Sequence, residues 1–337
     1  MKTHVNIPIF IPHLGCKNQC VFCNQRSISG VKEFDKSKVK YIIDDALKTV
    51  NPESEVEIAF FGGSFTGIDR DLMIYLLELA YSYVVSGRVH SIRCSTRPDY
   101  INIEILDILK KYGVRVIELG LQSADKDVLQ ASKRGHGFDE EKEACRLIVE
   151  RGFTLVGQMM IGLPLSTPEK ELMTADFIIS TGAKAARIYP TVVFNETELC
   201  DMSKTGVYSP ITLDEAVTRS AKVMKRFIDA GVAVIRVGLH SSENLRNEET
   251  YYAGPNHPAL GELVINEIYF DLIRSELQKN YKNERQNVNI VVAKGALSKA
   301  IGQRKRNLKR LNEIFPLLNI TFSEGSVPSE YSILVER

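Results

Sequence analysis

Three cysteines stand within eight positions near the start of the chain, in the stretch GCKNQCVFCNQ at residues 15–25. Cys16, Cys20 and Cys23 have the spacing C-x3-C-x2-C, which is too tight for useful disulfides and suits thiolates that converge on one metal centre. A [4Fe–4S] cluster with these three protein ligands would keep its fourth iron open to a small molecule. The main alternative is a structural zinc site, which needs a fourth ligand such as His13. Three unrelated free thiols would require chance clustering.

The remainder of the chain has the composition of a globular protein. Its 337 residues, 44% hydrophobic and 25% charged, suffice for one large domain and a small one. The net charge of +1 is unevenly spread, because residues 286–312 hold seven of the 43 Lys and Arg residues and none of the 42 Asp and Glu. A basic segment of this kind favours a polyanionic partner.

Neither a membrane anchor nor a secretion signal is expected. No apolar run approaches the length of a membrane span, and the opening stretch MKTHVNIPIFIPHLG lacks a small-residue cleavage site. The other cysteines, Cys94, Cys145 and Cys200, are scattered and give no disulfide framework. The reducing cytoplasm is therefore the expected location.

Short β-branched runs alternate with segments of helical period, and both kinds can be placed along the chain. Strands are expected at 5–14, 56–64, 89–97, 114–123, 154–164 and 183–194, with 232–241 as a seventh candidate, and helices at 35–50, 69–86, 102–112, 139–151, 167–181, 212–230 and 261–279. This alternation predicts an α/β protein with a parallel sheet, either doubly wound or an open barrel of six units. The cysteine loop follows the first strand, at the end where such folds carry chemistry.

Several motifs, in order along the chain, resemble the radical SAM superfamily. CKNQCVFC has its cysteine spacing and FFGGSFTG resembles its glycine motif. STRPD, ELGLQSADKDVL, KRGH, MIGLP and RIYPTVV resemble the branch that contains the Elongator catalytic subunit and the oxygen-independent coproporphyrinogen oxidases. The resemblance covers roughly residues 5–270. It implies a partial (β/α)6 TIM-like barrel, a [4Fe–4S] cluster on the three cysteines, and S-adenosylmethionine (SAM) bound at the open iron.

The resemblance also implies the chemistry. A donor such as flavodoxin or ferredoxin would reduce the cluster, which would cleave SAM to a 5′-deoxyadenosyl radical that takes a hydrogen from the substrate. The residues expected to bind the cofactor are Gly62, Gly63, Ser64, Glu118, Gln122 and Gly162.

Two of these expectations rest on physical arguments. The glycines allow backbone N–H groups to approach a ligand closely. Alternation along the fourth strand places Glu118 and Gln122 on its inner face. A buried carboxylate needs a partner, for which Arg97 or Arg187 is available, so a structural ion-pair network is the alternative interpretation of Glu118.

The C-terminal segment resembles a KH-type RNA-binding module. Its expected order is strand (288–294), helix (296–301), helix (306–315) and strand (319–323). The loop that clamps nucleic-acid phosphates in KH modules would be Gly302-Gln303-Arg304-Lys305, followed by Arg306. The second glycine of the KH loop is missing here, and a small cap with a solvated basic face is the alternative.

We therefore expect a radical SAM core at 1–200, an extension of it at 201–281 and a KH-like domain at 282–337. The predicted function is radical SAM modification of tRNA or rRNA. The acetyltransferase domain that accompanies the core in the Elongator family finds no room in this sequence, so carboxymethyl transfer is not carried over. The alternatives are a radical SAM enzyme for a small, porphyrinogen-like metabolite, with the C-terminal module as a cap, and a non-enzymatic RNA-binding protein with a structural metal.

Overall fold

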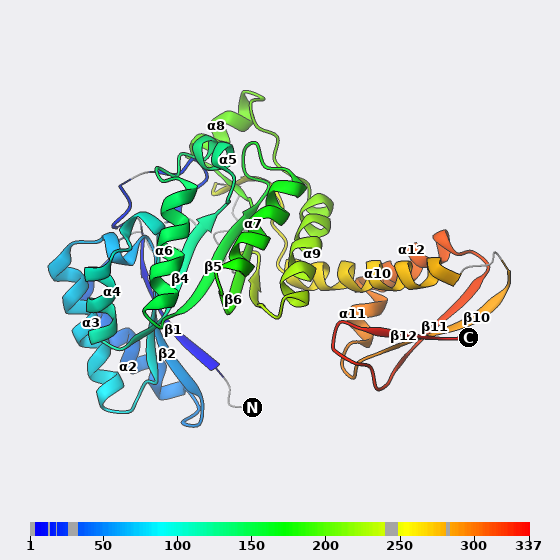
Figure 1. The fold of residues 1–337 in the computed structure, drawn as a ribbon, viewed down its shortest axis with the longest axis horizontal. Coiled ribbons are helices and arrows are strands. Elements are labelled where there is room, and N and C mark those ends of the chain that lie inside the picture. The colour runs from blue at the N-terminus through cyan, green and yellow to red at the C-terminus, as the bar shows by residue number, and fades with distance from the viewer. Residues whose placement is uncertain (1–3, 13, 18, 26–32, 240–248, 281–283) are drawn as a thin grey trace. The chain divides into compact units, whose positions relative to one another are not determined.

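The computed structural model describes residues 4–12, 14–17, 19–25, 33–239, 249–280 and 284–337. The chain divides into two compact units (Figure 1). The first unit comprises residues 1–211 and 226–256, and the second comprises residues 212–225 and 257–337. The three-part division with boundaries at residues 200 and 281 stays a prediction.

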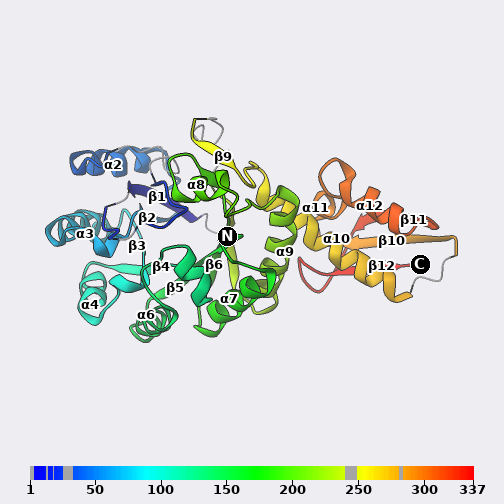
Figure 2. The same cartoon turned by 90° about the horizontal axis from the view of Figure 1, so that it is seen from above.

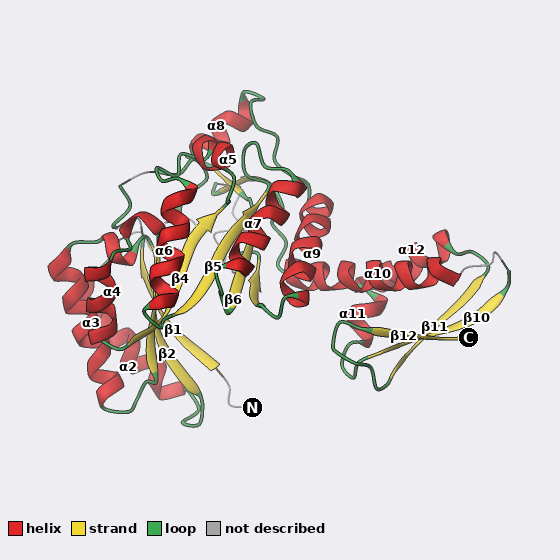
Figure 3. Cartoon of the chain, viewed as in Figure 1, coloured by secondary structure: helices red, strands yellow, loops and turns green. Residues whose placement is uncertain are grey.

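A seven-stranded sheet forms the centre of the first unit (Figure 3). All its pairings are parallel, and the strands follow one another in chain order, β1-β2-β3-β4-β5-β6-β8. These strands are β1 (His4–Ile11), β2 (Glu55–Gly62), β3 (Ser91–Thr96), β4 (Val114–Gln122), β5 (Thr154–Ile161), β6 (Ala185–Pro190) and β8 (Ala233–Val237). The six predicted strands and the seventh candidate are thereby confirmed.

Helices connect consecutive strands and lie along one side of the curved sheet (Figure 2). They are α2 (Val39–Thr49), α3 (Arg70–Val85), α4 (Ile103–Lys111), α6 (Phe138–Glu150) and α7 (Pro168–Ser180). A doubly wound sheet would carry helices on both faces, so the arrangement is the open, partial barrel. The predicted α/β fold class, a partial (β/α) TIM-like barrel, is confirmed with one strand more than the six units of the prediction.

Side-chain caps explain where several of these helices begin. Asp69, Asn102 and Thr167 each accept a hydrogen bond from a backbone N–H of the first helical turn. Such a bond satisfies one of the N–H groups that a helix start leaves without an intrahelical partner.

Several short elements were not predicted. They are α5 (Lys126–Ala131), α8 (Glu198–Lys204), β9 (Tyr251–Ala253) and β12 (Ile333–Glu336). The strand predicted at 183–194 is divided into β6 and the separate β7 (Val193–Phe194), which pairs with β9. Their periodic patterns are too short to read from hydrophobicity alone. Among the described helices, none is long and apolar enough to cross a membrane.

The second unit contains a three-stranded sheet of order β11-β10-β12. Strand β10 (Gln286–Val292) pairs parallel with β11 (Leu318–Glu324) and antiparallel with β12. The helices α10 (Leu260–Asn280), α11 (Leu297–Ile301) and α12 (Arg306–Ile314) complete this part, while the residues of α9 (Leu213–Asp229) are divided between the two units. The predicted strand–helix–helix–strand order of residues 288–323 is confirmed.

Candidate active site

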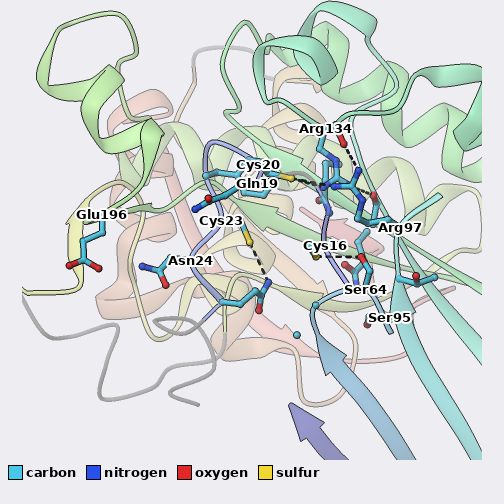
Figure 4. A pocket seen from close by; sticks show the side chains of 18 residues that line it. Cys16, Gln19, Cys20, Cys23, Asn24, Ser64, Ser95, Arg97, Arg134 and Glu196 are labelled. Atoms are coloured by element: carbon cyan, nitrogen blue, oxygen red, sulfur yellow. Dashed lines mark hydrogen bonds between the residues drawn. The ribbon is translucent and has the colours of Figure 1, made fainter. Parts of the chain in front are cut away.

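The three clustered cysteines line one cavity of about 460 Å³ beside the carboxyl ends of the parallel strands (Figure 4). We call it the cysteine cavity. Four of the predicted cofactor-binding residues lie in its wall, namely Gly62, Gly63, Ser64 and Gln122. Motifs that lie up to about a hundred residues apart in the sequence therefore meet, as expected where the strands of a parallel sheet end side by side.

Two other predicted cofactor residues lie elsewhere. Glu118 lines a neighbouring cavity of about 470 Å³ on the inner face of the barrel. Gly162 lines neither cavity: its N–H is bonded to Glu171, and Ile211 packs 2.6 Å from the position a Cβ would take. Of the predicted RNA-binding residues, Gly302–Lys305 lie in the second unit between α11 and α12, and Arg306 begins α12.

Glycines fit the cysteine loop tightly against the turn that follows β2. A Cβ on Gly15, whose φ is +78°, would lie 2.3 Å from the Ser64 carbonyl oxygen. A Cβ on Gly63 would lie 2.2 Å from the Leu14 carbonyl oxygen. No side chain fits at either position, so the two segments hold each other in place through bare backbone.

Two buried arginines surround the Cys20 thiol. Arg134 donates from Nη1 to Cys20 Sγ at 3.1 Å, and Arg97 does so at 3.7 Å. Arg97 is fixed by two hydrogen bonds to Asp99, of 2.8 and 3.1 Å. Burial opposes the charge of Asp99, but bonds from His136 and Arg97 outweigh it and lower the pKa of this carboxyl far below its usual value. The cavity therefore has a cationic wall beside one thiol.

The other two thiols contact polar side chains. Cys16 Sγ lies 3.5 Å from Ser64 Oγ, and Gln25 donates to Cys23 Sγ at 3.7 Å. Burial raises the pKa of the Cys23 thiol to about 12, and the nearby Cys20 and Cys16 thiols add to the rise. A ligand that needs the Cys23 thiolate must therefore displace a firmly held proton.

Glu118 belongs to a buried ion-pair network. Arg93 and Arg187 both donate to its carboxylate at 2.9 Å, and Gln158 donates at 2.9 Å. Arg93 continues the chain to the buried Glu57, with Nη2 2.6 Å from Oε2. Of the two partners predicted for Glu118, Arg187 is confirmed and Arg97 is wrong, because the side chain of Arg97 turns towards Asp99 and Cys20 instead.

Three cysteine thiols suit an iron–sulfur cluster or, with a fourth ligand, a zinc ion. Within the described part of the chain, no three His, Cys, Asp or Glu side chains are placed to bind one metal ion. The cysteine ligands of a cubane bind different irons, so they stand apart from one another, whereas the four ligands of zinc converge on one point. The fourth ligand proposed for zinc, His13, lies outside the described residues.

Comparison with known families bears on this site. Residues 10–178 match the radical SAM superfamily. The chain belongs to the radical SAM superfamily. Residues 183–269 match the radical SAM C-terminal domain. Membership makes the protein an enzyme of a family whose members use a [4Fe–4S] cluster and SAM.

Similar proteins extend the comparison. A tRNA uridine(34) acetyltransferase of Methanocaldococcus infernus is 27% identical over 199 residues, which cover 52% of this chain and 36% of that protein. Elongator complex protein 3 of Mus musculus is 30% identical over 205 residues, 54% and 38% of the two chains. An uncharacterized protein of Methanocaldococcus jannaschii is 30% identical over 221 residues, 62% and 67% of the two chains.

The fold has a solved counterpart. The structure of Methanocaldococcus infernus Elp3 superposes with a TM-score of 0.60 at 19% identity, and the match covers 83% of this chain and 63% of that one. The predicted resemblance to the Elongator-like branch is confirmed. This radical SAM chain spans little more than a third of the length of the acetyltransferases it matches.

Sequence reasoning missed Arg134 and the true position of Arg97. Both side chains reach the cysteine cavity, and Arg134 comes from the KRGH stretch that follows α5. The signal was available, because KRGH resembles a family motif and carries basic residues. Its contact with Cys20 could not be inferred, since the two residues are 114 positions apart.

Proposed function

We propose that Cys16, Cys20 and Cys23 hold a [4Fe–4S] cluster with one open iron, and that the enzyme modifies an RNA. The observation that carries the first part is the cysteine cavity itself, in which three thiols face a cationic wall and a glycine turn. The second part is supported by the basic turn of the second unit and by the tRNA-modifying names of the similar proteins.

The cavity offers unmet hydrogen-bonding groups for a ligand. Among the described residues, Gln122 Oε1 and Arg134 Nε are buried without a hydrogen-bond partner, and both residues line the cysteine cavity. An orphaned acceptor beside an orphaned guanidinium donor suits a zwitterionic amino acid, whose ammonium and carboxylate need the opposite groups. The methionine part of SAM has this character.

The residues then have distinct tasks. When bound, the cluster and SAM supply the one-electron chemistry that generates a hydrogen-abstracting radical. Arg134 pairs with the SAM carboxylate, and Gln122 accepts from a donor of SAM. Gly62 and Gly63 let backbone N–H groups approach SAM closely, while the hydroxyl of Ser64 lies within hydrogen-bonding distance of the Cys16 thiol. The surrounding barrel excludes water from the reacting atoms.

RNA recognition is assigned to the turn between α11 and α12. Arg304 and Lys305 are exposed there, and both occupy the left-handed region, with φ of 53° and 61°. Gly302 precedes them at φ +80°, where a Cβ would lie 2.9 Å from the Asn307 side chain. Strained residues of this kind cluster at binding sites, and basic side chains in a KH-like turn clamp phosphates. The KH-like assignment rests on this turn and the element order.

Two further predictions belong to the same proposal. The reductant is expected to be a flavodoxin or ferredoxin, and the location the cytoplasm. All six cysteines are unpaired, as a reducing compartment requires.

Anaerobic reconstitution tests the cluster. The wild-type chain should bind four irons and cleave SAM to 5′-deoxyadenosine when dithionite is added, whereas Cys20→Ser should lose both properties. Cys145→Ala, which removes a buried thiol of α6 that does not line the cysteine cavity, is the matched control and should keep them. Absence of SAM cleavage by the fully loaded wild type would refute the proposed chemistry.

RNA retention tests the substrate. The double variant Arg304→Ala with Lys305→Ala should release cellular RNA, and the slope of log affinity against log salt should fall by about 1.4 for two lost phosphate contacts. Lys110→Ala with Lys111→Ala removes two adjacent exposed charges from the first unit and serves as control. If both double variants retained RNA equally well, RNA binding by the KH-like turn would be refuted. The proposed substrate would then be a small molecule instead of RNA.

A further inference from the structure

A second cavity of about 470 Å³ adjoins the cysteine cavity on the inner face of the barrel. Seven residues line both cavities, Cys23, Gly62 and Gln122 among them. The volume lies within the range of about 300–1,000 Å³ typical of small-ligand sites. A molecule in this second cavity therefore lies directly beside the place assigned to SAM.

Aromatic side chains form much of its wall. Phe10, Phe61 and Phe194 come from β1, β2 and β7, and Tyr189 comes from β6. The rings of Phe10 and Phe61 lie 6.3 Å apart at 44°. Phe10 is 36% exposed although it points into the barrel, so an apolar surface is left uncovered there. Such walls suit a flat ring that stacks or slides between them.

The charges of the second cavity do not balance. Of the charged residues that line it, Glu118 and Arg187 belong to a chain of ion pairs that continues to Arg93 and Glu57, with two charges of each sign. Arg236, on β8, also lines the cavity but does not belong to this chain of ion pairs. Among the described residues, its hydrogen-bond acceptor is the Gly238 carbonyl at 3.1 Å. A guanidinium that lines the cavity and has no acidic partner among the described residues favours an anionic group on the ligand.

An unpartnered amide oxygen also belongs to this cavity. In the described part of the chain, Asn6 Oδ1 is buried and has no hydrogen-bond partner, and Asn6 lines the second cavity. Buried acceptors of this kind cost free energy unless a ligand donates to them. The ligand must therefore combine a flat face, a hydrogen-bonding edge and a negative charge.

We propose that the second cavity holds a single nucleotide extruded from an RNA strand, with its base against the phenylalanines and its phosphate at Arg236. A base inside a helix cannot reach a buried reaction centre, so extrusion into a pocket with stacking walls is the general solution. This assignment rests on the proposed function, because it names the part of the RNA that enters the barrel.

Binding of a mononucleotide tests the pocket without relying on RNA retention. The full chain, purified anaerobically with its cluster, is dialysed against labelled uridine or adenosine 5′-monophosphate. Arg236→Ala should weaken binding about tenfold, the loss expected for one charged hydrogen bond, and Arg236→Lys should restore part of it. Arg226→Ala, which removes an exposed arginine paired with Asp176, should bind as wild type does.

A second variant controls for the case in which Arg236→Ala fails to fold. Phe10→Ala removes a ring that is already 36% exposed, so the fold should survive while nucleotide binding weakens. In parallel, RNA carrying 4-thiouridine is crosslinked to the protein, and mass spectrometry should place the crosslinks on peptides of β1, β2 or β6.

The outcomes separate the two proposals. Crosslinks confined to the second unit, equal nucleotide binding by wild type and Arg236→Ala, or no nucleotide binding by wild type would each overturn the pocket assignment. RNA retention through Arg304 and Lys305 would still stand in those cases. Nucleotide binding in the pocket by a chain that retains no RNA would overturn both RNA proposals and leave a free nucleotide as the ligand of the second cavity.

Discussion

Arg134 donates a hydrogen bond to the Cys20 thiol across 3.1 Å, although 114 residues separate the two in sequence. A second bond, from Arg134 Nη2 to the carbonyl of Gly120, fixes the guanidinium at the end of β4. The cationic group is thereby held at the cysteine cavity before any ligand arrives. Such preorganisation lowers the ordering cost of binding an anion.

Arg134→Gln should therefore weaken SAM binding about tenfold, because it removes one charged hydrogen bond of about 1.5–3 kcal/mol. Equilibrium dialysis of SAM against the reconstituted protein measures this change. Lys133→Gln alters the charge of the neighbouring residue equally, but its side chain is exposed and paired with Glu198. Equal losses in the two variants would show that overall charge, not the position of Arg134, governs SAM affinity.

Gly15→Ala should displace the cysteine loop and abolish cluster binding. Its Cβ would lie 2.3 Å from the Ser64 carbonyl, a distance that only backbone movement relieves. Gly87→Ala is the matched control, because Gly87 has a similar φ of +73° but nothing within 4 Å of the added atom. Both variants carry the same left-handed strain, of about 1–2 kcal/mol, so iron content separates close approach from strain. If Gly87→Ala lost as much iron, the close approach of Gly15 to the Ser64 carbonyl would not be required for cluster binding.

The regular fold was predictable because each strand and helix of the first unit carries its own pattern. In β4, Glu118 and Gln122 alternate with buried Ile117, Leu119 and Leu121, and this period of two placed the inner face correctly. Short elements such as α5 and β12 escaped prediction, because too few residues establish a period.

The site was predictable only where residues are local in sequence. The triplet Cys16, Cys20 and Cys23 and the turn at Gly62 and Gly63 reveal themselves through spacing. The partner of a buried charge does not, since it depends on which side chains the barrel brings together. Arg93 lies in β3 and Arg97 directly follows the strand, four residues on, yet Arg97 reaches Cys20 and Arg93 reaches Glu118.

Glu141 should make the stability of the chain depend on pH. This carboxyl is fully buried on α6, and burial raises its pKa to about 7, although a 3.1 Å hydrogen bond with His136 partly opposes the rise. The unfolded chain releases this proton near pH 4.5, whereas the folded chain retains it until about 7. The free energy of unfolding is therefore highest below pH 4.5, where both states hold the proton. It declines as the pH rises from 4.5 to 7, because only the unfolded chain releases the proton in that range.

Urea unfolding of wild type and Glu141→Gln at pH 5 to 8 measures this decline. The wild type should lose about 3 kcal/mol of unfolding free energy relative to the glutamine variant across that range, as an upper bound. Glu143→Gln changes an exposed carboxyl of the same helix, whose pKa is lowered by the Arg146 side chain, so its difference from wild type should stay flat above pH 5. Parallel curves for wild type and Glu141→Gln would contradict the assignment.

Arg304→Gly should separate strain from charge in the basic turn of the second unit. Arg304 has φ 53° and ψ 30°, a conformation that glycine adopts freely and alanine does not. Both Arg304→Gly and Arg304→Ala remove the same charge, so RNA retention should fall equally in the two variants. The glycine variant should nevertheless be more stable than the alanine variant by about 1 kcal/mol, because the strain is relieved.

Hydrogen–deuterium exchange of the α11 and α12 amides reports this local stability directly. Slower exchange in Arg304→Gly than in Arg304→Ala, with equal loss of RNA, would mean that the turn holds a strained shape in order to present its charges. If Arg304→Gly retained RNA as wild type does, the guanidinium would not be a phosphate contact. If both variants exchanged alike, the left-handed conformation would cost the turn nothing, and the geometry of Lys305 alone would set its shape.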